Sequence, residues 1–133
     1  RDGLRRDMLK RNKKTKPTQI TTMDEMNDLA ADGPVLVDFF QKGCSPCQAM
    51  DGIVKEIADE FSGGLAVAKV NVAHAPELVQ RFKVMSTPTF VVLASAKNAK
   101  TVSLHQRWKG TGLIKKDALV KVVTDAGATP PST

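Results

Sequence analysis

Apolar residues recur along the chain at two spacings, and each change of spacing predicts the end of an element. Helical spacing predicts helices over residues 23–31, from the residues after Cys47 to Phe61, over 76–82 and over 113–126. Short runs rich in β-branched and aromatic residues predict strands over 35–40, 65–72, 90–93 and 101–108, with 18–22 as a short edge strand. The order β-α-β-α-β-α-β-β-α predicts an α/β fold, a central mixed β-sheet sandwiched by helices.

Turn-forming residues separate these elements. Asp32-Gly33-Pro34 is expected to end the first helix, which Thr21 or Thr22 would cap. Residues 95–100 are expected to form a hairpin loop with Asn98 as its turn residue, and residues 109–112 to turn the chain into the last helix. From that helix, four residues are available for burial: Leu113, Leu119, Val120 and Val123.

The length of 133 residues favours a single domain that can bury an apolar core without disulfide staples. The net charge of +6 is confined to the first sixteen residues, since residues 17–133 hold as many acidic as basic side chains. We therefore divide the chain into a basic N-terminal tail or short helix (1–17), a folded domain (18–127) and a flexible C-terminal tail (128–133). The basic tail is interpreted either as a solvated segment or as one lying against an anionic membrane or a protein partner. No aromatic platform for stacking nucleic-acid bases is visible, and we expect a monomer that binds no nucleic acid.

No stretch of the chain approaches the eighteen consecutive apolar residues of a membrane span. The compartment would therefore be set by what precedes Arg1. We expect a fragment or a processed form. A basic run after a lost span would favour the cytoplasmic or matrix side, so cytoplasm or mitochondrial matrix is the favoured localisation, with tethering through a segment upstream of Arg1 as the alternative.

Two cysteines, Cys44 and Cys47, are the only ones in the chain and stand directly after a predicted strand. The sulfur of Cys44 would face the free N-H groups and the positive end of the following helix, which favours its thiolate. Cys47 lies three residues later on the same helical face, one turn deeper, as a resolving thiol. Pro46 fits the first helical turn, which has N-H groups to spare, and stiffens the loop. This pattern predicts dithiol-disulfide exchange.

A metal site is the structural alternative for the cysteine pair. Zinc would need two further ligands, and the only histidines, His74 and His105, match no zinc-ligand spacing. An iron-sulfur cluster shared across a dimer is a further alternative that the sequence leaves open. We expect no metal and no cofactor other than a redox-active Cys44-Cys47 disulfide.

The chain resembles the thioredoxin family over about residues 18–127. The resemblance is carried by VLVDFF before CSPC, then AKVNV, then STPTF, then a Gly-bearing turn before a final amphipathic helix. It implies the thioredoxin fold and a protein-disulfide oxidoreductase, a redox carrier with protein disulfides as substrates and thioredoxin reductase or an equivalent as electron donor.

The resemblance also assigns site residues. Asp38, which would be costly to bury as an ion, matches the family's buried acid with a raised pKa that moves the proton of the second cysteine, and Lys69 matches the lysine beside it. Pro88 matches a cis-proline set against the cysteines, which would leave the backbone of Thr87 free to pair with a substrate peptide. Gly110 matches a glycine in the turn that completes the same groove.

Three positions depart from the family pattern. Gly43 stands where the family usually has Trp, so a flat apolar shelf for partners is missing and the partner set is expected to be restricted. Ser45 replaces the usual Gly between the cysteines, and its hydroxyl could shift the redox potential in either direction. Gly52 stands where many relatives have a helix-kinking Pro. Trp108 is interpreted as an apolar anchor of the last strand rather than a substitute for the missing Trp. We expect six residues to line the substrate-binding surface: Gly43, Ser45, Pro46, Thr87, Pro88 and Gly110.

The principal hypothesis is a reductant of protein disulfides, with Cys44 attacking, Cys47 resolving, Asp38 and Lys69 assisting. Two alternatives stay open from the sequence. One is a disulfide donor or isomerase of an oxidising compartment, and the other is a binding module that keeps the fold without catalysis.

Overall fold

The computed structural model describes residues 16–97 and 102–130. The basic N-terminal segment, apart from Lys16 and Pro17, and the predicted turn residue Asn98 lie outside the described residues. The elements are β1 (Thr18–Gln19), α2 (Met23–Ala30), β2 (Val35–Phe40), α3 (Ser45–Glu60), β3 (Ala66–Asn71), the 3-10 turn η1 (Val72–His74), α4 (Pro76–Arg81), β4 (Thr89–Lys97), β5 (Val102–Thr111) and α5 (Lys116–Asp125).

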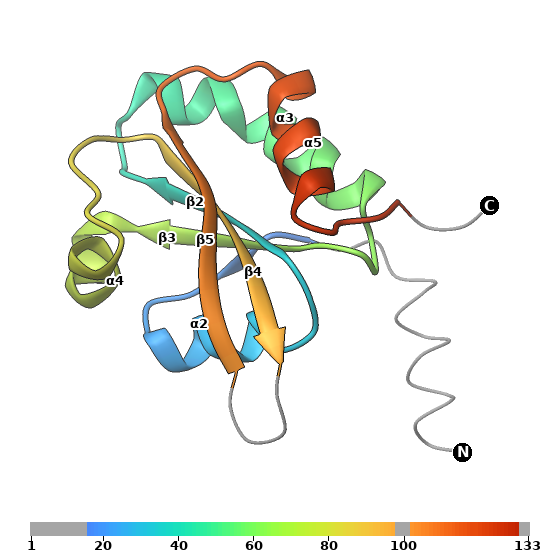
Figure 1. The fold of residues 1–133 in the computed structure, drawn as a ribbon. Coiled ribbons are helices and arrows are strands. Elements are labelled where there is room, and N and C mark those ends of the chain that lie inside the picture. The colour runs from blue at the N-terminus through green and yellow to red at the C-terminus, as the bar shows by residue number, and fades with distance from the viewer. Residues whose placement is uncertain (1–15, 98–101, 131–133) are drawn as a thin grey trace.

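Five strands form one mixed sheet in the order β1-β3-β2-β4-β5, which confirms the predicted fold class. The strands β1, β3 and β2 run parallel, whereas β4 is antiparallel to β2 and β5 is antiparallel to β4. Figure 1 shows α3 and α5 together on one side of the sheet, with α2 and α4 on the other. No helix in the described part of the chain is long and apolar enough to cross a membrane.

The sheet separates two apolar clusters, because successive side chains of a strand point to opposite faces. Val35, Val37 and Phe39 of β2 belong to the cluster beneath α2 and α4. Leu36 of β2 belongs to the cluster beneath α3 and α5, together with Phe90 of β4. We call these the α2–α4 side and the α3–α5 side of the sheet. The strand that leads to the cysteines is therefore buried on both faces.

Local sequence signals determine where α2 and α3 begin. Thr22 caps α2 in a capping box, in which its hydroxyl accepts from the Glu25 N-H at 3.1 Å and the Glu25 carboxylate accepts from the Thr22 N-H at 3.2 Å. Of the two threonines predicted as caps, Thr22 is thus the residue that caps the helix. Cys44 occupies the N-cap of α3, so the strand-to-helix transition places a cysteine where the free N-H groups are.

The hairpin between β4 and β5 is longer than the sequence predicted. Residues 95–97 belong to β4, and residues 109–111 belong to β5 rather than to a turn. Both stretches pair across the hairpin, Lys97 with Val102 and Thr111 with Thr89. Long-range pairing therefore overrides the weak strand preference of the Ser and Ala residues there. The last helix begins later than predicted, at Lys116, and Leu113 is 70% exposed rather than buried.

Candidate active site

The cysteine pair lies at the N-terminus of α3, and the structure has it as a disulfide with 5.2 Å between the two Cα atoms. The backbone N-H of Cys47 donates a hydrogen bond to the sulfur of Cys44 at 3.2 Å. Cys44 is half-buried, while Cys47 is only 5% exposed. An incoming partner would therefore meet Cys44 first, with Cys47 behind it.

The residues around the two cysteines suit a tight strand-to-helix transition. Gly43 has a φ of +78°, in the left-handed region that favours glycine, and it is exposed. Pro46 lies in the first turn of α3, where a missing N-H costs no hydrogen bond. Ser45 is the first residue of the helix and is exposed. The first turn of α3 thus presents its backbone and small side chains around Cys44, with no large side chain at position 43.

Asp38 lies in β2 on the α3–α5 side of the sheet and is only 1% exposed. Its Oδ1 atom has no hydrogen-bond partner among the residues that the structure describes. Burial raises the pKa of Asp38 to about 7, the nearby Lys69 ammonium opposes that rise, and the Asp51 carboxylate adds to it. A carboxyl group that titrates near neutral pH can both take up and release a proton under physiological conditions.

Lys69 stands opposite Asp38 in the parallel register of β2 and β3. Its ammonium does not pair with Asp38, however. It lies 3.0 Å from Oδ1 of Asp51 in α3 and 4.8 Å from the ring centroid of Phe40. Asp51 was missed by sequence reasoning. The signal that could have found it is its position four residues after Cys47, on the same face of the helix.

Thr87 and Pro88 approach the cysteine pair from the loop before β4. The peptide bond between them is cis, and the Thr87 hydroxyl donates to the sulfur of Cys44 at 3.6 Å. Pro88 is buried, and its carbonyl accepts from the N-H of Gly112 at 2.9 Å. The structure thus brings together the cysteines and the Thr-Pro sequence, which lie about forty residues apart in the chain.

Gly110 occupies a different place from the one predicted. It lies within β5 opposite Phe90, and the turn residue with a positive φ, +81°, is Gly112. A Cβ at position 110 would collide with the ring of Trp108, so glycine is required there for packing. Trp108 itself is half-buried and packs against the cluster on the α3–α5 side, which confirms its interpretation as an anchor of the last strand.

A groove of about 250 Å³ runs beside the Thr87-Pro88 loop. Its lining includes Gln41, Val72, Met85 and Thr87, and Met85 is 92% exposed. Because Thr87 contacts Cys44 and also lines the groove, a bound segment could extend from the groove to the reactive sulfur. The groove has an apolar lining that includes Val72 and Met85, whereas Gly43 next to Cys44 contributes no side chain.

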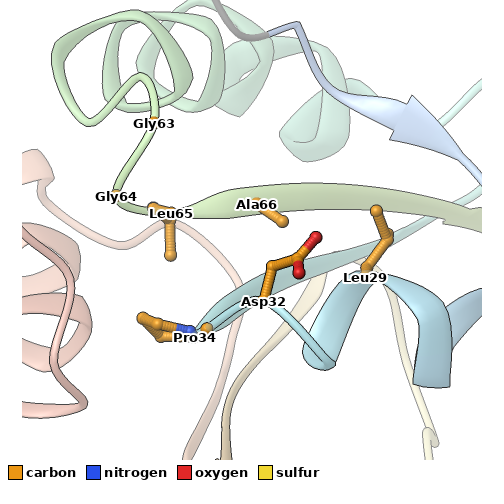
Figure 2. Close-up of a pocket in the computed structure, with 8 residues that line it drawn as sticks. Leu29, Asp32, Pro34, Gly63, Gly64, Leu65 and Ala66 are labelled. Carbon is orange, nitrogen blue, oxygen red and sulfur yellow. The ribbon is translucent and has the colours of Figure 1, made fainter. Parts of the chain in front are cut away.

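A second pocket, of about 170 Å³, lies at the opposite end of β2 and β3 from the cysteines. Figure 2 shows Leu29, Asp32, Pro34 and Leu65 around it, together with residues that begin β3. Asp32 is its one ionisable side chain, and it contains neither a cysteine nor a histidine. The pocket has no group suited to thiol chemistry.

Metal ligands do not gather at the cysteines within residues 16–97 and 102–130, where no group of three or more His, Cys, Asp or Glu side chains could hold a metal ion. His74 lies in η1, and His105 lies in β5 with an exposed side chain.

Comparisons with known proteins agree with this geometry. A sequence model of the family described as Thioredoxin matches residues 17–124. The chain is 30% identical over 106 residues to thioredoxin from Chlamydia muridarum, which covers 80% of this chain and 95% of that protein. It is 36% identical over 74 residues to the bifunctional thioredoxin reductase/thioredoxin of Mycobacterium leprae, covering 56% of this chain and 16% of that protein. Among solved structures, a mutant thioredoxin from Halobacterium salinarum superposes with a TM-score of 0.71 at 26% identity, covering 87% of this chain and 95% of that one.

Proposed function

Since the chain belongs to the thioredoxin family, we propose that it reduces protein disulfides, with Cys44 as the attacking thiol and Cys47 as the resolving thiol. The chain is a thiol-disulfide oxidoreductase; what is proposed is the direction of the reaction and the role of each residue. The observation that carries the assignment is the unequal exposure of the two sulfurs at the N-terminus of α3. Cys44 is accessible there, and Cys47 is almost fully buried behind it.

The reaction transfers two electrons from the dithiol to the substrate. The Cys44 thiolate attacks one sulfur of a substrate disulfide, the substrate S-S bond breaks, and a mixed disulfide forms while the leaving thiolate takes a proton. Cys47 then gives up its proton and attacks the sulfur of Cys44. The mixed disulfide breaks, the substrate leaves as a dithiol, and the Cys44-Cys47 disulfide remains.

Asp38 is the group proposed to take the proton from Cys47. Both lie between the sheet and α3, since Asp38 points to the α3–α5 side and Cys47 belongs to the buried face of α3. A base works best when its pKa is close to the working pH, and the pKa of Asp38 is raised to about 7. The carboxylate would accept the proton as Cys47 attacks and return it to solvent or to the reduced pair in the next cycle.

The substrate is proposed to lie along the groove beside Thr87 and Pro88. The groove offers an apolar wall that includes Val72 and Met85, and the backbone of Thr87 would pair with an extended peptide. Without a large side chain at Gly43, partner recognition would depend on this wall. The oxidised pair would be reduced again by a thioredoxin reductase or an equivalent donor, a partner suggested by the reductase and thioredoxin fused in the Mycobacterium leprae relative.

The test is to trap the mixed disulfide. Cys47→Ser should accumulate a covalent complex with a disulfide-containing protein, because the attacking thiol remains and the resolving thiol is gone. Cys44→Ser should trap nothing, and the unmodified chain with a thioredoxin reductase should turn the substrate over. Trapping by Cys44→Ser but not by Cys47→Ser would reverse the two roles.

The direction of the reaction is tested separately by the redox potential of the Cys44-Cys47 pair. A reductant should lie below about −200 mV, in the range of thioredoxins and glutaredoxins. A potential above about −180 mV would instead indicate a disulfide donor or isomerase.

A further inference from the structure

The lysine opposite the buried carboxyl group is engaged elsewhere. Asp38 and Lys69 are partners in the register of two parallel strands, which lie about 4.8 Å apart. Opposite charges at neighbouring positions of adjacent strands attract each other. The Lys69 ammonium instead lies 3.0 Å from Asp51 and over the ring of Phe40, while Oδ1 of Asp38 has no hydrogen-bond partner among the described residues.

Asp51 holds the ammonium at the rim of the site. The side chain of Lys69 is 24% exposed and that of Asp51 is 39% exposed, whereas Asp38 is 1% exposed. Asp51 stands one helical turn after Cys47 in α3, and its carboxylate accepts a hydrogen bond from Lys69 of β3. The same helix therefore carries the resolving cysteine and the carboxylate that pairs with the lysine.

We propose that Asp51 is a positioning residue of the redox site, which draws the Lys69 ammonium to the rim and away from the buried carboxyl group of Asp38. The proposal rests on the proposed function, in which Asp38 takes the proton of Cys47. A lysine paired with Asp38 would hold that carboxylate ionised and make it a weak base. With its ammonium shared by Asp51 and Phe40, Lys69 leaves Asp38 able to exchange a proton near neutral pH.

The charges around Asp38 support this arrangement. The charged groups that act on Asp38 are Lys69 from β3 and Asp51 from α3. Its register partner in β4 is the apolar Phe90, and Cys47 of α3 is uncharged because it is disulfide-bonded. Lys69 lowers the pKa of Asp38 and Asp51 raises it. From α5, the buried residues on this side are the apolar Leu119 and Val123. Besides burial, Asp51 and Lys69 are thus the two charges that determine the pKa of Asp38.

The experiment measures the titration of the Asp38 carboxyl carbon by NMR in the oxidised full chain, in which the cysteines do not titrate. Asp51→Ala should move the midpoint to lower pH by about half a pH unit or more, because Lys69 is freed to approach Asp38 and a negative charge is lost. Asp51→Glu should restore the midpoint toward that of the unmodified chain. Glu56→Ala is the matched control, since it removes a carboxylate from the same helix and breaks a 3.0 Å pair with Lys116; it should leave the midpoint unchanged.

Measuring Asp51→Ala in a chain that lacks the Lys69 ammonium separates the positioning of Lys69 from the direct effect of the Asp51 charge on Asp38. Lys69→Met should raise the midpoint, and adding Asp51→Ala to Lys69→Met should lower it by less than Asp51→Ala does alone, since no ammonium remains to be released. An equal effect of Asp51→Ala in both backgrounds, or no effect in the unmodified chain, would overturn the proposal. These titrations need no turnover, so they succeed or fail independently of the trapping experiment.

The kinetic consequence is read from the pH dependence of mixed-disulfide resolution. In Asp51→Ala the apparent pKa of the resolution rate should move to lower pH in step with the NMR midpoint, while trapping by Cys44 continues. An unchanged pH profile beside a shifted NMR midpoint would overturn the role of Asp51 in the reaction.

Discussion

The two sides of the sheet bury different kinds of side chain from the same strand. Toward α2 and α4, β2 contributes Val35, Val37 and Phe39, all fully buried in an apolar cluster. Toward α3 and α5 it contributes Leu36 to an apolar cluster and, two residues later, the carboxyl group of Asp38. Burying an ionisable group without a hydrogen-bond partner costs free energy. The α2–α4 side therefore buries only apolar side chains of β2, while the α3–α5 side gives up some stability by burying an ionisable group.

The largest expected effect comes from the α2–α4 side. Phe39→Ala removes a fully buried ring that lies 5.9 Å from the ring of Phe82 between centroids. It should lower the free energy of unfolding by about 3 to 5 kcal/mol, measured by urea denaturation, because the cavity cannot be refilled. The loss should be the same at acidic and at alkaline pH, since no ionisable group of that cluster is involved. A loss that varies with pH between about 4 and 8 would break the distinction between the two sides.

The next effect has the opposite sign and comes from the α3–α5 side. The pKa of Asp38 is about 7 in the folded chain against an ordinary value of 3.8, so the folded state binds more protons than the unfolded state between these values. Its contribution to stability is fully present at low pH and is lost as the pH rises through about 7. Asp38→Asn should therefore raise the free energy of unfolding by about 1 to 3 kcal/mol at a pH of about 8 and change it little at about 4.

The same substitution has a kinetic control. Asp38→Asn should slow the resolution of the mixed disulfide while Cys44 still attacks, because only the proton transfer from Cys47 is affected. Urea denaturation of the oxidised chain at the two pH values gives the stability, and the trapping assay gives the rate. Destabilisation by Asp38→Asn of equal size at both pH values would mean that the carboxyl group is a structural element of the α3–α5 side.

The sequence predicted the parts of the molecule that depend on local pattern. The bounds of β2 agree with the structure, because the apolar run there ends at Phe40 and is followed by the polar Gln41 and Lys42. The sequence left the cap of α2 open between Thr21 and Thr22. The structure has Thr22, which forms a capping box with Glu25 three residues later. The strand order of the sheet and the extra length of the hairpin depend on pairing between distant residues, which composition and periodicity do not report.

The candidate site shows the same division. The cysteines and the Thr87-Pro88 sequence follow from spacing and from the resemblance to the thioredoxin family, and the structure brings them into contact. The partner of Lys69 does not follow, because Asp51 is eighteen residues away in the chain. The spacing of Asp51 from Cys47 places it near the site but does not identify the side chain that it pairs with. The predicted burial of Leu113 is wrong because the helix starts later than its apolar spacing suggested. Since α5 begins at Lys116, Leu113 precedes the helix and is not carried on its buried face.

The smallest expected effect tests whether the α3–α5 side can be stabilised without touching Asp38. Gly52 lies inside α3 with an exposed position and open space where a Cβ would be. Gly52→Ala should raise the free energy of unfolding by about 0.5 to 1 kcal/mol, because alanine loses less backbone freedom in a helix. Gly52→Ser should give a smaller gain, and both variants should keep the pH dependence of stability that Asp38 causes. A loss of stability in Gly52→Ala would mean that α3 depends on glycine at this point for its path over the sheet. The stability lost on the α3–α5 side would then come from the helix that carries the cysteines as well as from the buried carboxyl group of Asp38.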